Sequence, residues 1–158
     1  PGAAWPQKTW LVDYYKELVN LIENKLGLSI VIIGSKNDRI CSEIANDKSK
    51  QILDLHGKLD LRKSLAIISL GQMTVGSDTG MVHASEALGV PVAMVMGPTN
   101  AQMGGGISLD RSVVIEKDIW CRPCSQNGKR PCYRSQQYCM TEISTSDVYR
   151  AVQGVLAL

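Results

Sequence analysis

Short, continuous apolar runs alternate along this chain with segments of helical periodicity, and this alternation limits the possible folds more than any other feature. Residues 28–33 and 92–96 are apolar runs typical of strands that are buried on both faces of a sheet. Residues 11–26, 61–70 and 79–88 instead follow helical patterns. Such alternation favours right-handed crossovers and a parallel sheet covered by helices on both faces. We therefore predict a Rossmann-like, doubly wound parallel α/β domain.

Further elements extend this pattern. We expect a helix over residues 38–46 and a terminal helix that begins with a capping box made by Ser144 and Asp147. Residues 52–55, 73–75 and 113–115 complete the expected strands. The alternation opens with a loop and a helix, so the strand expected before Pro1 is missing. Either the chain is a piece of a longer polypeptide, or its sheet is completed elsewhere.

Composition and charge exclude several classes of function. With 158 residues, 44% of them hydrophobic, the chain can form one domain with a substantial core. A net charge of only +2 argues against a nucleic-acid partner held by a strong positive field. No apolar run approaches the roughly 18–20 residues that cross a bilayer, and the first residues do not resemble a signal peptide. Five cysteines, an odd number, fit a reducing compartment, so we expect a cytoplasmic location.

The most informative motif reads Ser-Asp-Thr-Gly-Met-Val-His over residues 77–83. It predicts a strand, a tight turn and the start of a helix. The start of a helix offers unpaired N–H groups and the positive end of its dipole, which favour an anionic ligand. Gly80 removes the side chain that would keep a phosphate away from those amides. Because ligands bind beyond the carboxyl ends of parallel strands, we predict a site for the diphosphate of a nucleotide sugar.

Three motifs follow one another in the middle of the chain: Asp78-Thr79-Gly80-x-x-His83, Ala87-Leu88-Gly89-x-Pro91 and Gly97-Pro98-Thr99. Together they resemble glycosyltransferase family 9, the bacterial lipopolysaccharide heptosyltransferases. The opening Pro1-Gly2-Ala3, with Lys8 and Trp10, is similar to the start of that family's donor-binding half. The resemblance implies that residues 1–158 are the C-terminal donor-binding domain of a GT-B enzyme. The N-terminal acceptor domain, with the catalytic base, would then be absent from this chain.

The resemblance also implies a reaction. Such enzymes transfer heptose from ADP-heptose to the lipid A–core oligosaccharide, with inversion and without a required metal or cofactor. The isolated domain would bind the donor and be inactive, and the acceptor would be held by the missing domain. The full enzyme would work at the inner face of the inner membrane, as a peripheral protein. Two alternatives stay open: a non-catalytic nucleotide-binding module, and a GT-B enzyme that uses a UDP- or GDP-sugar.

Candidate site residues follow from the motif and from the resemblance. The diphosphate is assigned to Thr79, Gly80, His83, Lys8 and Ala4. Asp78 is assigned to the hydroxyls of the donor sugar, or to the helix amides as an N-cap. The nucleoside is assigned to Leu59, Asp38 and Gly34. Glu86 stands where the family has a small residue, and it is expected to form a salt bridge, to bond His83 or to contact a different sugar.

Four cysteines, Cys121, Cys124, Cys132 and Cys139, gather in a Cys-rich excursion over residues 121–139. Their C-x2-C-x7-C-x6-C spacing could hold a structural Zn²⁺, with free thiols or disulfides as the alternatives. The excursion is also basic, through Arg122, Lys129, Arg130 and Arg134. Such a segment either faces an anionic glycolipid or membrane surface, or is a solvated loop.

Overall fold

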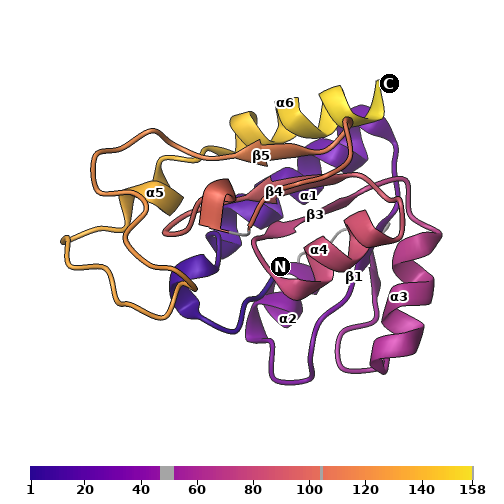
Figure 1. Cartoon of the computed structure of the whole chain (residues 1–158). Helices are drawn as coiled ribbons and strands as arrows, with labels where there is room; N and C mark the ends of the chain where they lie inside the picture. The colour runs from indigo at the N-terminus through magenta and orange to yellow at the C-terminus, as the bar shows by residue number, and fades with distance from the viewer. Residues whose placement is uncertain (47–51, 104, 158) are drawn as a thin grey trace.

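Parallel strands form two groups in the computed structural model, which describes residues 1–46, 52–103 and 105–157 (Figure 1). β1 (Ile30–Ile32) pairs with β2 (Ile52–Asp54). β3 (Thr74–Ser77), β4 (Val92–Val95) and β5 (Val113–Ile115) pair in that order. β4 is buried along its whole length, as expected for a central parallel strand. The described strands thus form two parallel sheets, one of two strands and one of three.

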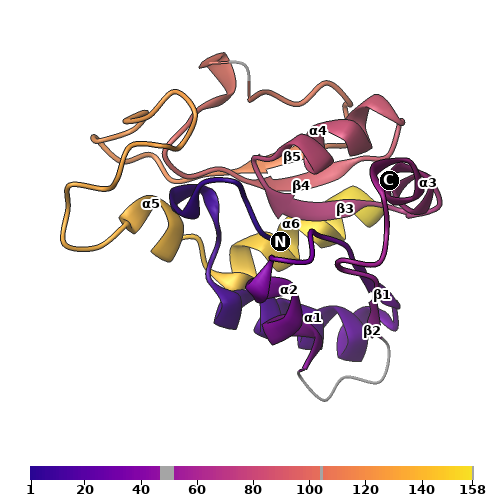
Figure 2. The same ribbon diagram turned by 90° about the horizontal axis from the view of Figure 1, so that it is seen from below.

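Helices cover both faces of these strands (Figure 2). α1 (Val12–Leu26), α2 (Arg39–Ala45) and α6 (Thr145–Leu156) lie together on one face. α3 (Leu61–Ser69) and α4 (Gly80–Ala87) contact each other on the opposite face, where α4 packs on β3 and β4. The short helices are η1 (Pro6–Lys8), η2 (Ala101–Met103) and α5 (Tyr138–Thr141).

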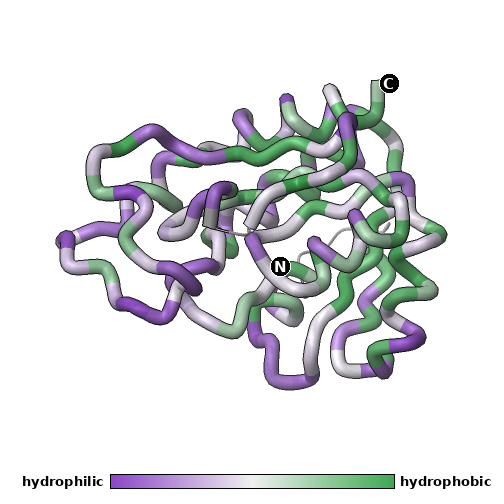
Figure 3. Tube along the Cα trace, viewed as in Figure 1, coloured by the Kyte–Doolittle hydropathy of each residue, from purple (hydrophilic) through white to green (hydrophobic). Residues whose placement is uncertain are grey.

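The largest side chain of the core is Trp10, which is 1% exposed. Its ring packs edge-on against Tyr14 and Tyr15, and its Nε1 donates to the carbonyl of Ile143 at 3.0 Å. Because the chain has no phenylalanine, aliphatic and methionine side chains fill most of the remaining interior. Figure 3 shows hydrophobic residues following the strands and the helix faces that pack on them. The bond from Trp10 to Ile143 fixes the segment before α1 to the segment before α6.

The predicted fold class is confirmed, with small changes at the ends of elements. The helix expected over 79–88 is α4 (Gly80–Ala87), and the strand expected over 73–75 is β3 (Thr74–Ser77). The capping box of Ser144 and Asp147 is present. The sequence did not predict η1, η2 or α5. No helix in the described ranges is long and apolar enough to cross a membrane.

Asp147 lies in the capping box of α6, and its substitution tests how much its ionised carboxylate stabilises the fold. The ammonium of Lys117, 2.9 Å away, and the Ser144 backbone lower the pKa of Asp147 from 3.8 to about 2. A carboxylate with a lowered pKa stabilises the fold above its unfolded pKa, and this contribution is lost as the pH falls through the folded value. Asp147→Asn should therefore reduce the free energy of unfolding by about 1 kcal/mol at pH 7. The difference from the unmodified chain should shrink between pH 4 and pH 2, as measured by urea unfolding.

Asp13→Asn is the matched control, because Asp13 is also near a helix start but its side chain is 85% exposed and 3.9 Å from Lys16. It should change stability little at any pH. Equal pH profiles for the two variants would contradict the role given to Asp147.

Candidate functional site

The turn between β3 and α4 leaves the amino end of α4 open. Thr79 has an extended backbone and is the N-cap residue of the helix. Its carbonyl accepts from the amides of Val82 and His83, at 3.0 and 3.2 Å. No side-chain hydrogen bond caps α4 within the described chain. The first amides of the helix, at Gly80 and Met81, are thus available to a ligand.

A cavity of about 1180 Å³ opens at this helix end. A Cβ atom built on Gly80 would meet no other atom within 4 Å, so the space in front of this residue is open. The cavity brings together most of the residues that the sequence assigned to a donor: Ala4, Lys8, Gly34, Asp38, Asp78, Thr79 and Gly80. Of the assigned residues, His83 and Leu59 are not among those that line it.

The carboxylate of Asp78 organises the cavity mouth. Asp78 is only 6% exposed. Its Oδ2 lies 2.7 Å from the Nζ of Lys8 and accepts from the Oγ1 of Thr99 at 2.8 Å, and its Oδ1 lies 2.8 Å from the Nε2 of His83. Burial by itself raises the pKa of Asp78, but the hydrogen bonds from these three side chains outweigh it and leave the pKa below its ordinary value. Asp78 is therefore ionised at neutral pH.

These contacts revise the roles expected for the motif. The alternative in which Asp78 caps α4 is wrong, because Thr79 is the N-cap and the Asp78 carboxylate bonds the side chains of Lys8, His83 and Thr99. Lys8 and His83, which the sequence assigned to phosphate, are both held by Asp78. Their side chains keep 15% and 35% exposure, so His83 is the more accessible of the two.

The nucleoside end of the predicted site lies beside β1. Gly34 follows this strand closely, and a Cβ there would come within 3.0 Å of the carboxylate of Asp38 and 2.6 Å of the thiol of Cys41. A Cβ on Gly2 would overlap the same carboxylate, so the opening loop packs directly on Asp38. Leu59 lies in the turn after Gly57 (φ +66°), outside the cavity lining. The structure thus joins Gly34 and Asp38 to the cavity, but not Leu59.

Arg122 has a structural role that the sequence did not predict. Its side chain is 7% exposed, so the expectation that it forms part of an exposed basic surface is wrong. The guanidinium donates to the carbonyls of Gly97, Lys117 and Thr99, and it lies 2.7 Å from Glu116. Such a planar group with five donors can hold several acceptors at once. Arg122 therefore fixes the loop that presents the Thr99 hydroxyl to Asp78.

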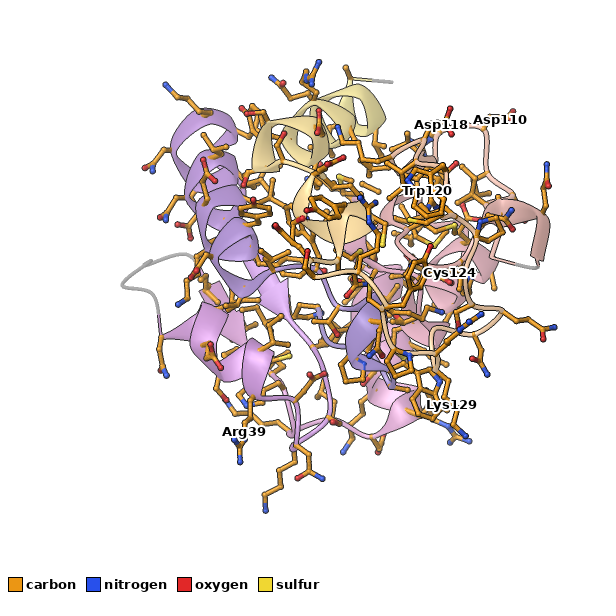
Figure 4. The ribbon with its side chains drawn as sticks, turned by 90° about the vertical axis from the view of Figure 1, so that its left-hand side faces the viewer. Arg39, Asp110, Asp118, Trp120, Cys124 and Lys129 are labelled. Carbon is orange, nitrogen blue, oxygen red and sulfur yellow. The ribbon has the colours of Figure 1, made fainter. Side chains whose placement is uncertain are left out.

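The Cys-rich excursion also braces Lys8. Gly128 has a positive φ of +79°, and a Cβ there would overlap the methylene chain of Lys8. Its neighbour Asn127 lines the cavity. An Asn-Gly pair is a turn signal in the sequence, but no spacing rule places that turn against Lys8. Figure 4 views this side of the molecule and labels Cys124 and Lys129 of the excursion, and Trp120 directly before it.

The four cysteines of the excursion line one small pocket, together with Arg122, Arg134 and Tyr138 among others. All of them are free thiols. Burial raises the pKa of Cys124 and of Cys139, which keeps these two thiols protonated at neutral pH. Within residues 1–46, 52–103 and 105–157, no group of three or more His, Cys, Asp or Glu side chains is arranged to hold a metal ion.

Glu86 differs from the expectation that linked it to His83. It is buried, and it accepts from the amides of Ser108 and Leu109. The loop that it holds runs close to the site, since a Cβ on Gly105 would lie 3.4 Å from the Oδ2 of Asp78. Glu86 therefore positions a loop above the site instead of contacting His83.

Comparisons with known proteins agree on one family. The profile of glycosyltransferase family 9 (heptosyltransferase) matches residues 1–133. Lipooligosaccharide heptosyltransferase 2 of Haemophilus ducreyi is 32% identical over 108 residues, which are 63% of this chain and 31% of that protein. Lipooligosaccharide heptosyltransferase 2 of Campylobacter jejuni is 20% identical over 160 residues, 99% of this chain and 49% of that protein.

Among solved structures, the ADP-heptose lps heptosyltransferase II of E. coli superposes with a TM-score of 0.82 at 22% identity. The superposition covers 99% of this chain and 45% of that one. This likeness supports the fold. The chain spans less than half the length of these three relatives.

Substitution of Thr99 tests whether its hydrogen bond to Asp78 stabilises the cavity mouth. Thr99→Val removes the hydroxyl that donates to Asp78 and leaves a buried carboxylate with one donor fewer. The free energy of unfolding should fall by about 1–3 kcal/mol at pH 7, as measured by urea denaturation. Thr99→Ser keeps the hydroxyl and is the matched control, which should lose less. If both variants are equally stable, the bond to Asp78 does not stabilise the site.

Proposed function

Because this chain belongs to glycosyltransferase family 9, we propose that it is the part of a heptosyltransferase that binds the nucleotide-sugar donor, with ADP-heptose as the expected donor. The observation that carries the proposal is the open amino end of α4, where the Thr79–Gly80 turn faces a cavity beside Lys8 and Asp78. An anion is the ligand that suits such a helix end.

The diphosphate binds at the Thr79–Gly80 turn in this proposal, through the first amides of α4 and the Thr79 hydroxyl. Lys8 has three N–H donors, so it can keep its contact with Asp78 and also donate to a phosphate oxygen. As the glycosidic bond breaks, negative charge grows on the leaving nucleoside diphosphate. Donors that are already in place stabilise this charge more than they stabilise the ground state.

The carboxylate of Asp78 can accept one more hydrogen bond, from a sugar hydroxyl. A carboxylate has about four acceptor sites, and three donors already use it in the structure. The remaining acceptor site is the one that we assign to a hydroxyl of the donor sugar. The ring of His83 uses Nε2 toward Asp78, so its Nδ1 donates to a phosphate oxygen only as an imidazolium, in which both ring nitrogens carry a proton.

The whole reaction needs a second domain. We propose inverting, metal-independent transfer of heptose to the lipid A–core oligosaccharide, with the catalytic base and the acceptor site outside these 158 residues. The chain alone should bind the donor and transfer nothing. It would act at the cytoplasmic face of the inner membrane, and the exposed Trp120 and Tyr133 beside Arg134 are the groups suited to peripheral contact.

Gly80→Val tests the diphosphate site. A valine at this position meets open space in the protein, so the fold should tolerate it. The same side chain would stand in front of the α4 amides and exclude a phosphate. The affinity for ADP, measured by calorimetry, should fall at least about tenfold, or about 1.4 kcal/mol. Gly154→Val on α6 is the matched control, because a Cβ there also meets no atom within 4 Å.

The outcome separates the proposed donor from its alternatives. Equal affinity of the Gly80 and Gly154 variants for ADP would contradict the phosphate geometry. A thermal-shift comparison of ADP, UDP and GDP sugars at one concentration then identifies the nucleotide, because the ligand that binds the folded chain most tightly raises the unfolding temperature most. Transfer activity in the longer protein distinguishes an enzyme from a non-catalytic nucleotide-binding module.

A structural Zn²⁺ at Cys121, Cys124, Cys132 and Cys139 remains a second proposal, based on their spacing and shared pocket. The described residues do not form a metal-binding group as they stand, so a bound metal would require the thiols to move together and deprotonate. Metal analysis of the purified protein should then find about one equivalent of zinc. A double Cys121→Ser, Cys124→Ser variant should lose it and a Cys41→Ala variant should keep it. Protein purified without any bound metal would remove this proposal.

A further inference from the structure

A half-buried tryptophan, Trp5, lines the cavity. The other two tryptophans differ from it, because Trp10 is buried in the core and Trp120 is 78% exposed. We propose that Trp5 is a sugar-binding residue, whose ring packs against a face of the donor's sugar while Asp78 accepts from one of the sugar hydroxyls. This inference rests on the proposed function, and it names the side chain that recognises the apolar part of the sugar.

The backbone places Trp5 near the part of the cavity that is assigned to the sugar. Trp5 is the N-cap residue of η1, and its carbonyl accepts from the amide of Lys8 at 2.9 Å. The ammonium of Lys8 lies 2.7 Å from Asp78, the carboxylate assigned to the sugar. Gly2, earlier in the same loop, packs on Asp38 at the nucleoside end. The loop thus runs from the nucleoside end toward Asp78, and Trp5 lies in its second half.

The Cys-rich excursion holds the indole of Trp5 in place. The Nζ of Lys129, which is labelled in Figure 4, lies over this ring at 5.4 Å from its centroid, a cation–π contact. The preceding residue, Gly128, packs against the stem of Lys8. Of the described residues, Trp5 lines the cavity and Lys129 does not, so we assign the ammonium to the outer face of the ring. An indole that is already positioned loses little freedom when a ligand packs on its other face.

A sugar ring is chemically complementary to an indole and a carboxylate that lie close together. Its hydroxyls project from the edge of the ring, whereas its C–H groups form apolar faces. The negative face of an aromatic ring attracts such C–H groups and disfavours an anion, so Trp5 suits the sugar better than the diphosphate. The ionised carboxylate of Asp78 accepts from a hydroxyl. Trp5 and Asp78 therefore recognise two different sides of the same group.

Calorimetry with ADP and with ADP-heptose tests this role. Trp5→Leu keeps an apolar side chain and removes the flat ring. The affinity for ADP-heptose should fall about tenfold and the affinity for ADP less than about twofold, because ADP ends at its second phosphate. Trp120→Leu is the matched control, since its ring also lies beside a cation, Arg134 at 5.5 Å, but is not part of the described cavity lining. This control should leave both affinities unchanged.

NMR spectroscopy tests the contact in the unmodified chain. The three tryptophans give three indole N–H signals, and the Trp5→Leu spectrum identifies the one that belongs to Trp5. Addition of ADP-heptose should shift the Trp5 signal, and addition of ADP should shift it much less. The signal of Trp10, whose Nε1 donates to Ile143 in the core, should move with neither ligand. The signal of Trp120 should also stay in place.

The outcomes distinguish this inference from the proposed function. A chain that binds neither ADP nor ADP-heptose would contradict the proposed function, and the sugar contact would fall with it. If Trp5→Leu weakens the binding of both ligands equally, the ring contacts the nucleoside or the diphosphate, and only the sugar contact is overturned. An unchanged affinity of the variant for ADP-heptose, or a Trp5 signal that ADP-heptose does not move, would overturn it as well. Retained binding of ADP shows that the variant is folded.

Discussion

The buried carboxylate of Asp78 is the group on which the arrangement of the candidate site depends. A buried charge is costly unless other groups compensate it. Here the compensation comes from Lys8 before α1, His83 on α4 and Thr99 after β4. Two segments that are distant in sequence, one before α1 and one after β4, are thereby tied to the turn that opens α4. These contacts within the protein hold the site's side chains in place, which reduces the ordering that an incoming anion must bring about.

The excursion after β5 supports this arrangement from outside. Arg122 holds the carbonyls of the 97–99 loop, and the amides of Cys124 and Ser125 donate to Pro98. Gly128 packs against the stem of Lys8. The excursion, which has little regular structure, thus helps to position Lys8 and Thr99 against the carboxylate of Asp78. Its contribution to a donor site is indirect, through positioning.

The sequence predicted the parts of the molecule that are encoded locally. The strand, turn and helix around Asp78–Gly80 follow from apolar periodicity and the chemistry of helix ends, and they are present. Lys8 was assigned through a family resemblance, and the structure brings it to Asp78. Arg122, Gly128 and the amide partners of Glu86 could not be predicted, because their roles depend on contacts between segments 22 to 120 residues apart. The division of the strands into two groups was likewise visible only in three dimensions.

Sharing one carboxylate among three donors also constrains how this chain can change at the site. A lineage that loses the Thr99 hydroxyl or the Lys8 ammonium keeps the buried carboxylate of Asp78 with one donor fewer. Selection would then favour a second change at position 78 or at the remaining donors. Substitutions at these four positions should therefore arise together in descendants, as a linked set. Drift at one of them alone would be the rarer evolutionary event.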